Sequence, residues 1–180
     1  TVAQLGYLFL VFPLLTSAPA AAWSGGMYHL LSHALAKAAL FLAAGAMVHA
    51  LGDDRLDVLA GIGQKMPVTF TAFGIAALNL VGLPPSGGFI GKWLLLTASM
   101  TSGQWWWAVV MAAGSLLAAG YVLLVLRTAF LQPGADPLPQ QPPLLMTAGA
   151  LTLALIALAL GLWAEVPLAL LGAAAPGAPN

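Results

Sequence analysis

Three ionisable residues, four positions apart, lie in an otherwise apolar stretch of the sequence. His29, His33 and Lys37 are surrounded mainly by Leu, Ala and Phe. On an α-helix, steps of four place side chains on one face, here along a line about 12 Å long. An ionisable group inside a hydrocarbon-spanning helix costs at least about 2.5–3.5 kcal/mol and commonly lines a path for ions or protons. The spacing therefore predicts a proton-conducting helix face, directed toward the protein interior.

A second isolated cation, Lys92, follows a sequence that interrupts helices. Residues 83–88 contain two adjacent prolines and two adjacent glycines, and such pairs stop a helix. Non-helical backbone inside a membrane is tolerated only against protein or a water-filled cavity, and transporters place ion sites at such breaks. We therefore expect Lys92 to lie beside a break, where water can deliver protons. The expected break consists of Pro84, Pro85, Gly87 and Gly88.

The composition indicates an integral membrane protein. Of the 180 residues, 61% are hydrophobic and 6% are charged, whereas a water-soluble domain has about 25% charged residues. Five basic and five acidic residues cancel, so nothing suggests nucleic-acid binding. The absence of cysteine excludes disulfides, thiolate metal sites, iron–sulfur clusters and cysteine nucleophiles from this chain. No cofactor and no metal site are predicted.

The hydrophobic pattern predicts an all-α, polytopic bundle of transmembrane helices. About 20 apolar residues cross the roughly 30 Å of hydrocarbon in a bilayer. The first stretch is shorter than that and carries no basic n-region, so we expect the chain to begin inside a helix of a longer protein. The tail from residue 167 is expected to be frayed or interfacial. The predicted spans are 2–15, 24–51, 67–100 with the break at 84–88, 104–126 and 144–163.

The distribution of basic residues favours one crossing, not two, for 67–100. A single discontinuous crossing places Arg55, Lys65 and Arg127 on the same side of the membrane, whereas two crossings would separate them. Lys and Arg favour the cytoplasmic side. The sequence therefore predicts a multi-pass protein of the cell (inner) membrane, with loops 52–66 and 127–143 in the cytoplasm.

Three motifs, in this order and at this spacing, resemble one family. They are Thr-Val-Ala-Gln-Leu-Gly-Tyr at 1–7, His-x-x-x-His-Ala-x-x-Lys-Ala-x-Leu-Phe-Leu at 29–42, and Gly-Leu-Pro-Pro-Ser-Gly-Gly-Phe-Ile-Gly-Lys at 82–92. Together they resemble the antiporter-like, proton-translocating subunits of respiratory complex I (NADH:quinone oxidoreductase) and the large subunits of Mrp-type cation/proton antiporters. The resemblance extends to about Arg127.

The resemblance implies a fold, a role for each site residue and a set of partners. Such subunits contain two inverted five-helix repeats, so 1–131 would be part of the second repeat. Residues 132–180 would form a linker, the final helix and a short tail. His29, His33 and Lys37 would belong to a central hydrophilic axis, and protons would leave from Lys92. The partners would be protons, Na⁺ in the case of an antiporter, other membrane subunits and lipid. Redox chemistry would lie elsewhere in the complex, and complex I, Mrp and membrane-bound hydrogenase membership stay open.

The same residues also fit other interpretations, in packing, in metal binding or in a scaffold. His29 and His33 could simply pack between helices, with their rings hydrogen-bonded to neighbouring backbone groups. Haem ligation is disfavoured because two histidines on one helix cannot approach opposite faces of an iron, and a zinc site lacks a carboxylate within the spans. Lys37 is too far from either end of its helix to reach the interface. The alternative function is a non-transporting membrane scaffold that anchors partner subunits, which would have no reason to keep buried lysines.

Overall fold

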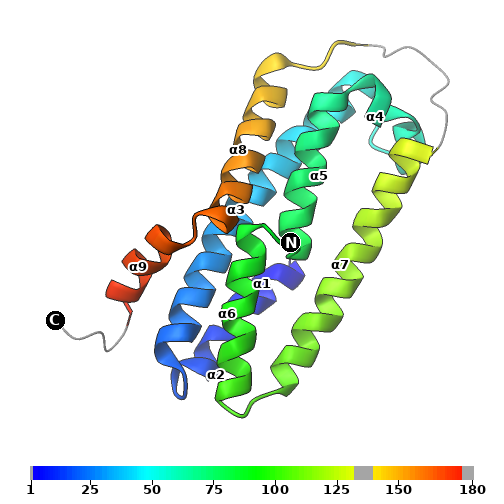
Figure 1. Ribbon diagram of the computed structural model, residues 1–180. Helices are drawn as coiled ribbons and strands as arrows, with labels where there is room; N and C mark the ends of the chain where they lie inside the picture. Colours follow the sequence, from blue (N-terminus) through cyan, green and yellow to red (C-terminus); the bar gives the residue numbers. More distant parts are fainter. Residues whose placement is uncertain (1, 132–139, 176–180) are drawn as a thin grey trace.

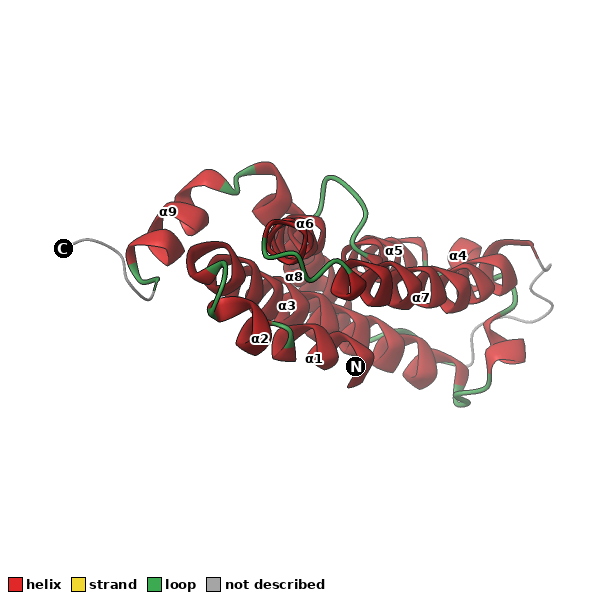
Figure 2. Ribbon diagram, turned by 90° about the horizontal axis from the view of Figure 1, so that it is seen from below, coloured by secondary structure: helices red, strands yellow, loops and turns green. Residues whose placement is uncertain are grey.

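The computed structural model describes residues 2–131 and 140–175, which form helices and connecting loops without strands (Figures 1 and 2). The predicted all-α membrane bundle is confirmed, because α3, α7 and α8 are long and apolar enough to cross a bilayer. Between α3 and α5 lie one turn of 3₁₀ helix and the short α4. The elements are α1 (Val2–Phe9), α2 (Val11–Leu15), α3 (Pro19–Leu51), a 3₁₀ turn (Leu56–Leu59), α4 (Ile62–Lys65), α5 (Pro67–Val81), α6 (Gly87–Thr101), α7 (Trp106–Leu131), α8 (Leu144–Leu162) and α9 (Glu165–Ala173).

Helices α5 and α6 follow one another in the same direction. Each has 15 residues, about 22 Å at 1.5 Å per residue, so neither alone matches a bilayer core of about 30 Å. Figure 1 shows α5 in the upper half of the bundle, α6 in the lower half, and α7 returning beside both. The segment is thus one discontinuous path and not a hairpin of two antiparallel helices.

The break between α5 and α6 is bounded by two capping residues. Gly82 adopts a left-handed conformation with φ of 86° and ends α5. Ser86 begins α6, and its hydroxyl accepts a hydrogen bond from the backbone N–H of Phe89 at 3.2 Å. Pro84 and Pro85 lie in the break, as expected. Gly87 and Gly88, also expected there, instead form the first turn of α6, because the serine cap starts the helix before them.

Several predicted boundaries differ from the structure. The stretch 2–15 is two helices, because Pro13 lacks an N–H and its ring would clash with the carbonyl four residues earlier, where α1 ends. Helix α3 begins at Pro19 and not at 24, since proline is favoured at the first helical position. Helix α7 extends to Leu131, so the first residues of the predicted loop 127–143 are helical, and 132–139 lie outside the described residues. The tail contains α9.

Alanine side chains form the contact between α3, α5 and α8, and we call this contact the alanine seam. All six alanines are fully buried, so the three backbones approach closely, as is common between membrane helices. Large hydrophobic side chains such as Leu117 on α7 and Leu145 on α8 point outward, where a bilayer would solvate them. The alanine seam consists of Ala39, Ala43, Ala72, Ala76, Ala150 and Ala154.

The described segments that flank the predicted loops lie at the same end of the bundle. The backbone N–H of Gln140 donates to the carbonyl of Ala50 near the end of α3, at 3.2 Å. Gly63 in α4 lies against the ring of Phe130 near the end of α7. Figure 1 shows the ends of α3 and α7, α4 and the beginning of α8 together at the upper end. The segments that carry Arg55, Lys65 and Arg127 therefore share one end.

Candidate functional site

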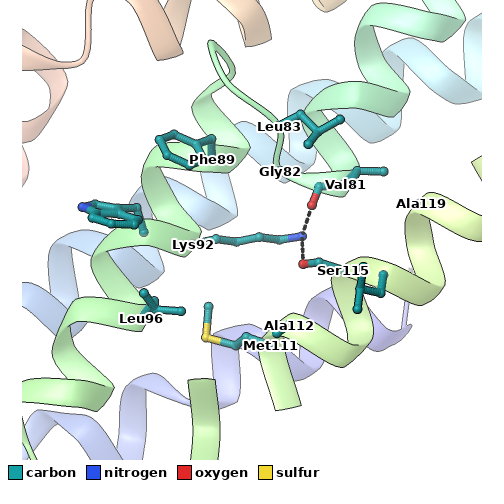
Figure 3. A pocket seen from close by; sticks show the side chains of 12 residues that line it. Val81, Gly82, Leu83, Phe89, Lys92, Leu96, Met111, Ala112, Ser115 and Ala119 are labelled. Atoms are coloured by element: carbon teal, nitrogen blue, oxygen red, sulfur yellow. Dashed lines mark hydrogen bonds between the residues drawn. The ribbon is translucent and has the colours of Figure 1, made fainter. Parts of the chain in front are cut away.

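Lys92 lies at the helix break, with its ammonium group on the C-terminal end of α5. Its Nζ donates to the carbonyls of Leu80 and Val81 at 3.0 and 2.9 Å and to Ser115 Oγ at 3.1 Å (Figure 3). An ammonium has three protons, and these three acceptors match them. Leu80 and Val81 are the last residues of α5, whose carbonyls have no partner within the helix, and a helix C-terminus attracts a cation. The break thus creates a cation site, in which Lys92 is only 7% exposed.

A cavity of about 460 Å³ lies beside Lys92, between α6 and α7. Figure 3 shows the Lys92 side chain extending across it from α6 toward Val81 and Ser115. Hydrocarbon side chains form most of the walls, so the ammonium stands at the boundary between helix-end carbonyls and an apolar space. The large apolar residues that line the cavity are Leu83, Phe89, Trp93, Leu96, Met111 and Leu116.

Tyr7 of α1 stands between Lys92 and the histidine helix. Lys92 Nζ is 5.1 Å from the centroid of the Tyr7 ring, within the range of a cation–π interaction. The same ring packs against the His29 ring in a T-shaped arrangement, with the ring centroids 5.8 Å apart and the planes at 66°. The Tyr7 hydroxyl donates to the carbonyl of Met111 at 3.3 Å, which fixes the ring from its far end. Tyr7 therefore contacts both groups that the sequence singles out.

His29 and His33 are buried in the interior and lie next to each other. They are 2% and 7% exposed, and their rings stack with centroids 5.9 Å apart and an angle of 23° between the planes. His29 Nε2 lies 3.4 Å from the backbone carbonyl of Gln4. Among the residues that the structure describes, His29 Nδ1 and Gln4 Oε1 are buried without a hydrogen-bond partner. Backbone bonding therefore accounts for one ring nitrogen of His29 and leaves the other without a partner among the described residues.

Lys37 lies one helical turn beyond His33 and has a different environment. It is half-buried, and its Nζ lies 4.4 Å from the centroid of the Phe41 ring. It lines a separate cavity of about 220 Å³ formed by α3, α5 and α7, together with Phe73 and Tyr121. The structure thus brings His33, His29 and Lys92 into one series through Tyr7, with Lys37 at its other end.

Comparison with known proteins decides the family. Residues 1–118 match the protein family described as "NADH:quinone oxidoreductase/Mrp antiporter, TM". The chain belongs to this family. The antiporter-like family that the three motifs resemble is thereby confirmed, and the chain is an integral membrane protein of this type.

Relatives come from more than one kind of oxidoreductase. The chain is 39% identical over 147 residues to NADH-quinone oxidoreductase subunit N of Desulforudis audaxviator, which covers 79% of this chain and 29% of that protein. It is 34% identical over 172 residues to F(420)H(2) dehydrogenase subunit L of Methanosarcina mazei, covering 89% of this chain and 26% of that protein. The chain therefore spans less than a third of the length of these two relatives.

Solved structures share the fold. A chain of an Mrp complex from a Dietzia species aligns with a TM-score of 0.83 and 29% identity, over 95% of this chain and 40% of the other. A chain of respiratory complex I from Thermus thermophilus with bound aureothin aligns with a TM-score of 0.65 and 29% identity, over 91% of this chain and 36% of the other.

Tyr7 and Ser115 are the site residues that sequence reasoning missed. Tyr7 belongs to the first motif, but an aromatic residue in an apolar helix gives no sign of a neighbouring cation. Ser115 is a single hydroxyl in a long apolar span, and such residues are common at contacts between membrane helices. Only the tertiary arrangement, which brings α1 and α7 to the end of α5, identifies them.

Proposed function

We propose that this chain carries protons along Lys37, His33, His29 and Lys92 as part of a membrane subunit of a complex I-like oxidoreductase or an Mrp-type antiporter. The observation that supports the proposal best is the unbroken series of contacts from His33 to His29 to Tyr7 to Lys92, with separations of 5.9, 5.8 and 5.1 Å. These separations join ring centroids or, for Lys92, Nζ and the ring centroid, so they describe packing of neighbouring groups. Proton transfer between the polar atoms of these groups would require water molecules between them.

Each group in the series can accept and donate a proton. A neutral imidazole accepts at one nitrogen and donates at the other, so His29 and His33 can pass a proton along without a net change. Lys92 is held as an ammonium by helix-end carbonyls but faces a largely apolar cavity, which provides no counter-charge. Charged Lys37 and Lys92 repel each other, so protonation of one favours release from the other.

We further propose the cell (inner) membrane as the location, with loops 52–66 and 127–143 on the cytoplasmic side. The common end of Arg55, Lys65 and Arg127 supports this orientation, because basic residues favour the cytoplasm. In this proposal 1–131 is part of a second inverted repeat, and 132–180 holds a linker, a final helix and a tail. Other membrane subunits are the partners, with Na⁺ as a further transported ion in the antiporter case. The two aligned structures, of an Mrp complex and of respiratory complex I, support such an assembly.

The alternative, a membrane scaffold without transport, requires no buried cation. A scaffold anchors its partners through packed helix faces, and leucine at position 92 would serve it better than a lysine that costs desolvation energy. Lys92 and the buried histidines therefore favour transport.

Substitution of Lys92 in the complete complex, reconstituted in proteoliposomes, tests the proposal. We expect Lys92→Ala to lower proton uptake by about a hundredfold, the usual effect of removing a proton-transfer group. Lys92→Arg should fail as well, because arginine stays charged. Lys65→Ala, at the loop end of the bundle, is the matched control and should leave uptake near the wild-type rate. Wild-type uptake in both Lys92 variants would contradict the proposal.

A further inference from the structure

The Asn79 side chain joins three helices at the break. Its Oδ1 accepts a hydrogen bond from the backbone N–H of Gly88 at 2.7 Å and from the Ser32 hydroxyl at 3.0 Å. Its Nδ2 donates to the Ser32 carbonyl at 3.1 Å. Asn79 is 2% exposed and Ser32 is fully buried, so water does not compete for these bonds. One amide of α5 thereby holds the first turn of α6 against α3.

Asn79 and Lys92 make hydrogen bonds across the break in opposite directions. The Asn79 side chain, on α5, bonds to α6, and the Lys92 side chain, on α6, bonds to α5. The N–H of Gly88 is among the first N–H groups of α6, which have no acceptor within the helix, and Asn79 of α5 provides one. The carbonyls of Leu80 and Val81 are among the last of α5, and Lys92 of α6 provides their donor. Each half of the broken helix therefore satisfies free backbone groups of the other half.

The first turns of α6 have no room to shift. A Cβ added at Gly88 would lie against the backbone carbonyl of Asn79, and one added at Gly91 would lie 2.7 Å from the backbone nitrogen of His29. Ser32 lies between His29 and His33 in the sequence, so the Asn79 contact also connects the break to the histidine helix. The backbone acceptors of Lys92 directly follow Asn79 in α5.

We propose that Asn79 is a positioning residue, which sets the register between α5 and α6 so that Lys92 reaches its acceptors and faces the histidine helix. The inference rests on the proposed role of Lys92 in proton transfer and adds the element that aligns it. Without the amide, the N–H of Gly88 loses its acceptor, and α6 loses one of the contacts that hold it in register with α3 and α5.

Proton uptake by the complete reconstituted complex is the first measurement. We expect Asn79→Leu, which has similar volume but no polar group, to lower uptake about tenfold or more, since small displacements of a reacting group have effects of this size. Ser32→Ala removes one of the three bonds and should lower uptake about two- to threefold. The double variant should be no slower than Asn79→Leu, because Ser32 acts through Asn79. Thr128→Val is the control, because the Thr128 hydroxyl donates a hydrogen bond to the Leu124 carbonyl of its own helix.

Accessibility of residue 92 is the second measurement and does not depend on transport. The 180 residues contain no cysteine, so the labelling that Lys92→Cys adds over the unsubstituted complex reports the reaction of residue 92 with a small water-soluble thiol reagent. We expect Asn79→Leu to raise this labelling rate about fivefold or more, because the loosened break opens more often. Thr101→Cys, exposed at the far end of α6, should change less than about twofold.

The outcomes separate the two proposals. Unchanged uptake and unchanged labelling in Asn79→Leu would overturn the positioning role. If Asn79→Leu prevents assembly of the complex, proton uptake by Ser32→Ala tests the positioning role instead. Wild-type uptake in Ser32→Ala would then overturn that role. Wild-type uptake in Lys92→Ala, together with faster labelling of Lys92→Cys when Asn79→Leu is added, would support the positioning of residue 92 and contradict only its part in proton transfer.

Discussion

The Lys92 ammonium lies over the face of the Tyr7 ring, 5.1 Å from its centroid, while the same ring packs against His29 in a T-shaped arrangement. The face of an aromatic ring is electron-rich and attracts a cation, and T-shaped ring pairs are favourable. One residue of α1 thus has favourable contacts with a lysine of α6 and a histidine of α3.

Replacement of Tyr7 separates the contribution of its ring from that of its hydroxyl. Tyr7→Phe keeps the ring between Lys92 and His29 and loses the bond to the Met111 carbonyl, so we expect proton uptake within about threefold of wild type. Tyr7→Leu also removes the cation–π contact, worth about 0.5–2 kcal/mol, and should lower uptake about tenfold. Both are measured in proteoliposomes that hold the complete complex.

Phe9 provides the control for these substitutions. It lies on α1, the helix of Tyr7, and is 68% exposed. Phe9→Leu should transport at the wild-type rate. Equal rates for Tyr7→Phe and Tyr7→Leu would show that the Tyr7 ring has no role in the path.

The three histidines of α3 should differ in their effect on transport. His29 and His33 are buried and stacked, whereas His49 is exposed near the end of the helix. Glutamine, like histidine, can donate and accept hydrogen bonds, but it cannot take up a proton. We therefore expect His29→Gln and His33→Gln each to lower proton uptake about tenfold to a hundredfold, and His49→Gln to leave it unchanged. Wild-type uptake in both buried variants would favour a role in packing alone.

Close packing of α6 on α3 predicts a sharp difference between two glycines. A Cβ at Gly91 would lie 2.7 Å from the His29 backbone nitrogen and 2.8 Å from its Cα, whereas one at Gly120 would meet nothing within 4 Å. Gly91→Ala should therefore destabilise the subunit by about 1–3 kcal/mol through overpacking. Gly120→Ala should be neutral or slightly stabilising. The amount of assembled complex in native gels and its melting temperature would distinguish them, and an equal effect of both would contradict the packing described.

The proposed orientation can be tested with single cysteines and a membrane-impermeant thiol reagent. Asp54→Cys and Gln140→Cys lie at the loop end of the bundle, and Thr101→Cys lies at the opposite end, where α6 finishes. We expect the first two to react only from the cytoplasmic side and the third only from the far side. Reaction of Asp54→Cys and Thr101→Cys from one side, with Gln140→Cys reacting from the other, would mean that 67–101 crosses the membrane twice.

The helices and the ionisable site residues could be predicted from sequence because each depends on local information. An apolar stretch predicts a membrane helix wherever it packs, and a lysine within such a stretch is unusual whatever surrounds it. The pair of prolines in 83–88 likewise identifies a break without reference to other helices. The serine cap at Ser86, which places Gly87 and Gly88 inside α6, is a finer local feature that the glycine pair obscured.

The contacts that organise the site could not be predicted, because they join residues far apart in the chain. Tyr7 meets Lys92 only because α1 packs beside α6, and Ser115 reaches it only from α7. In the sequence, Asn79 fits a contact between helices and a contact with channel water equally well. Its bonds to Ser32 and Gly88 become evident only when α3, α5 and α6 are placed together.

The alanine seam has a consequence for motion. Alanine has no rotatable side-chain torsion beyond its methyl group, so the interface between α3, α5 and α8 has no alternative rotamers through which it could repack. Helices joined in this way move together as one rigid unit. Around the cavity between α6 and α7, by contrast, Lys92, Leu96, Met111 and Leu116 each have several torsions. We therefore expect rearrangement during a proton cycle to involve the side chains of α6 and α7 that line this cavity, against a fixed frame of α3, α5 and α8.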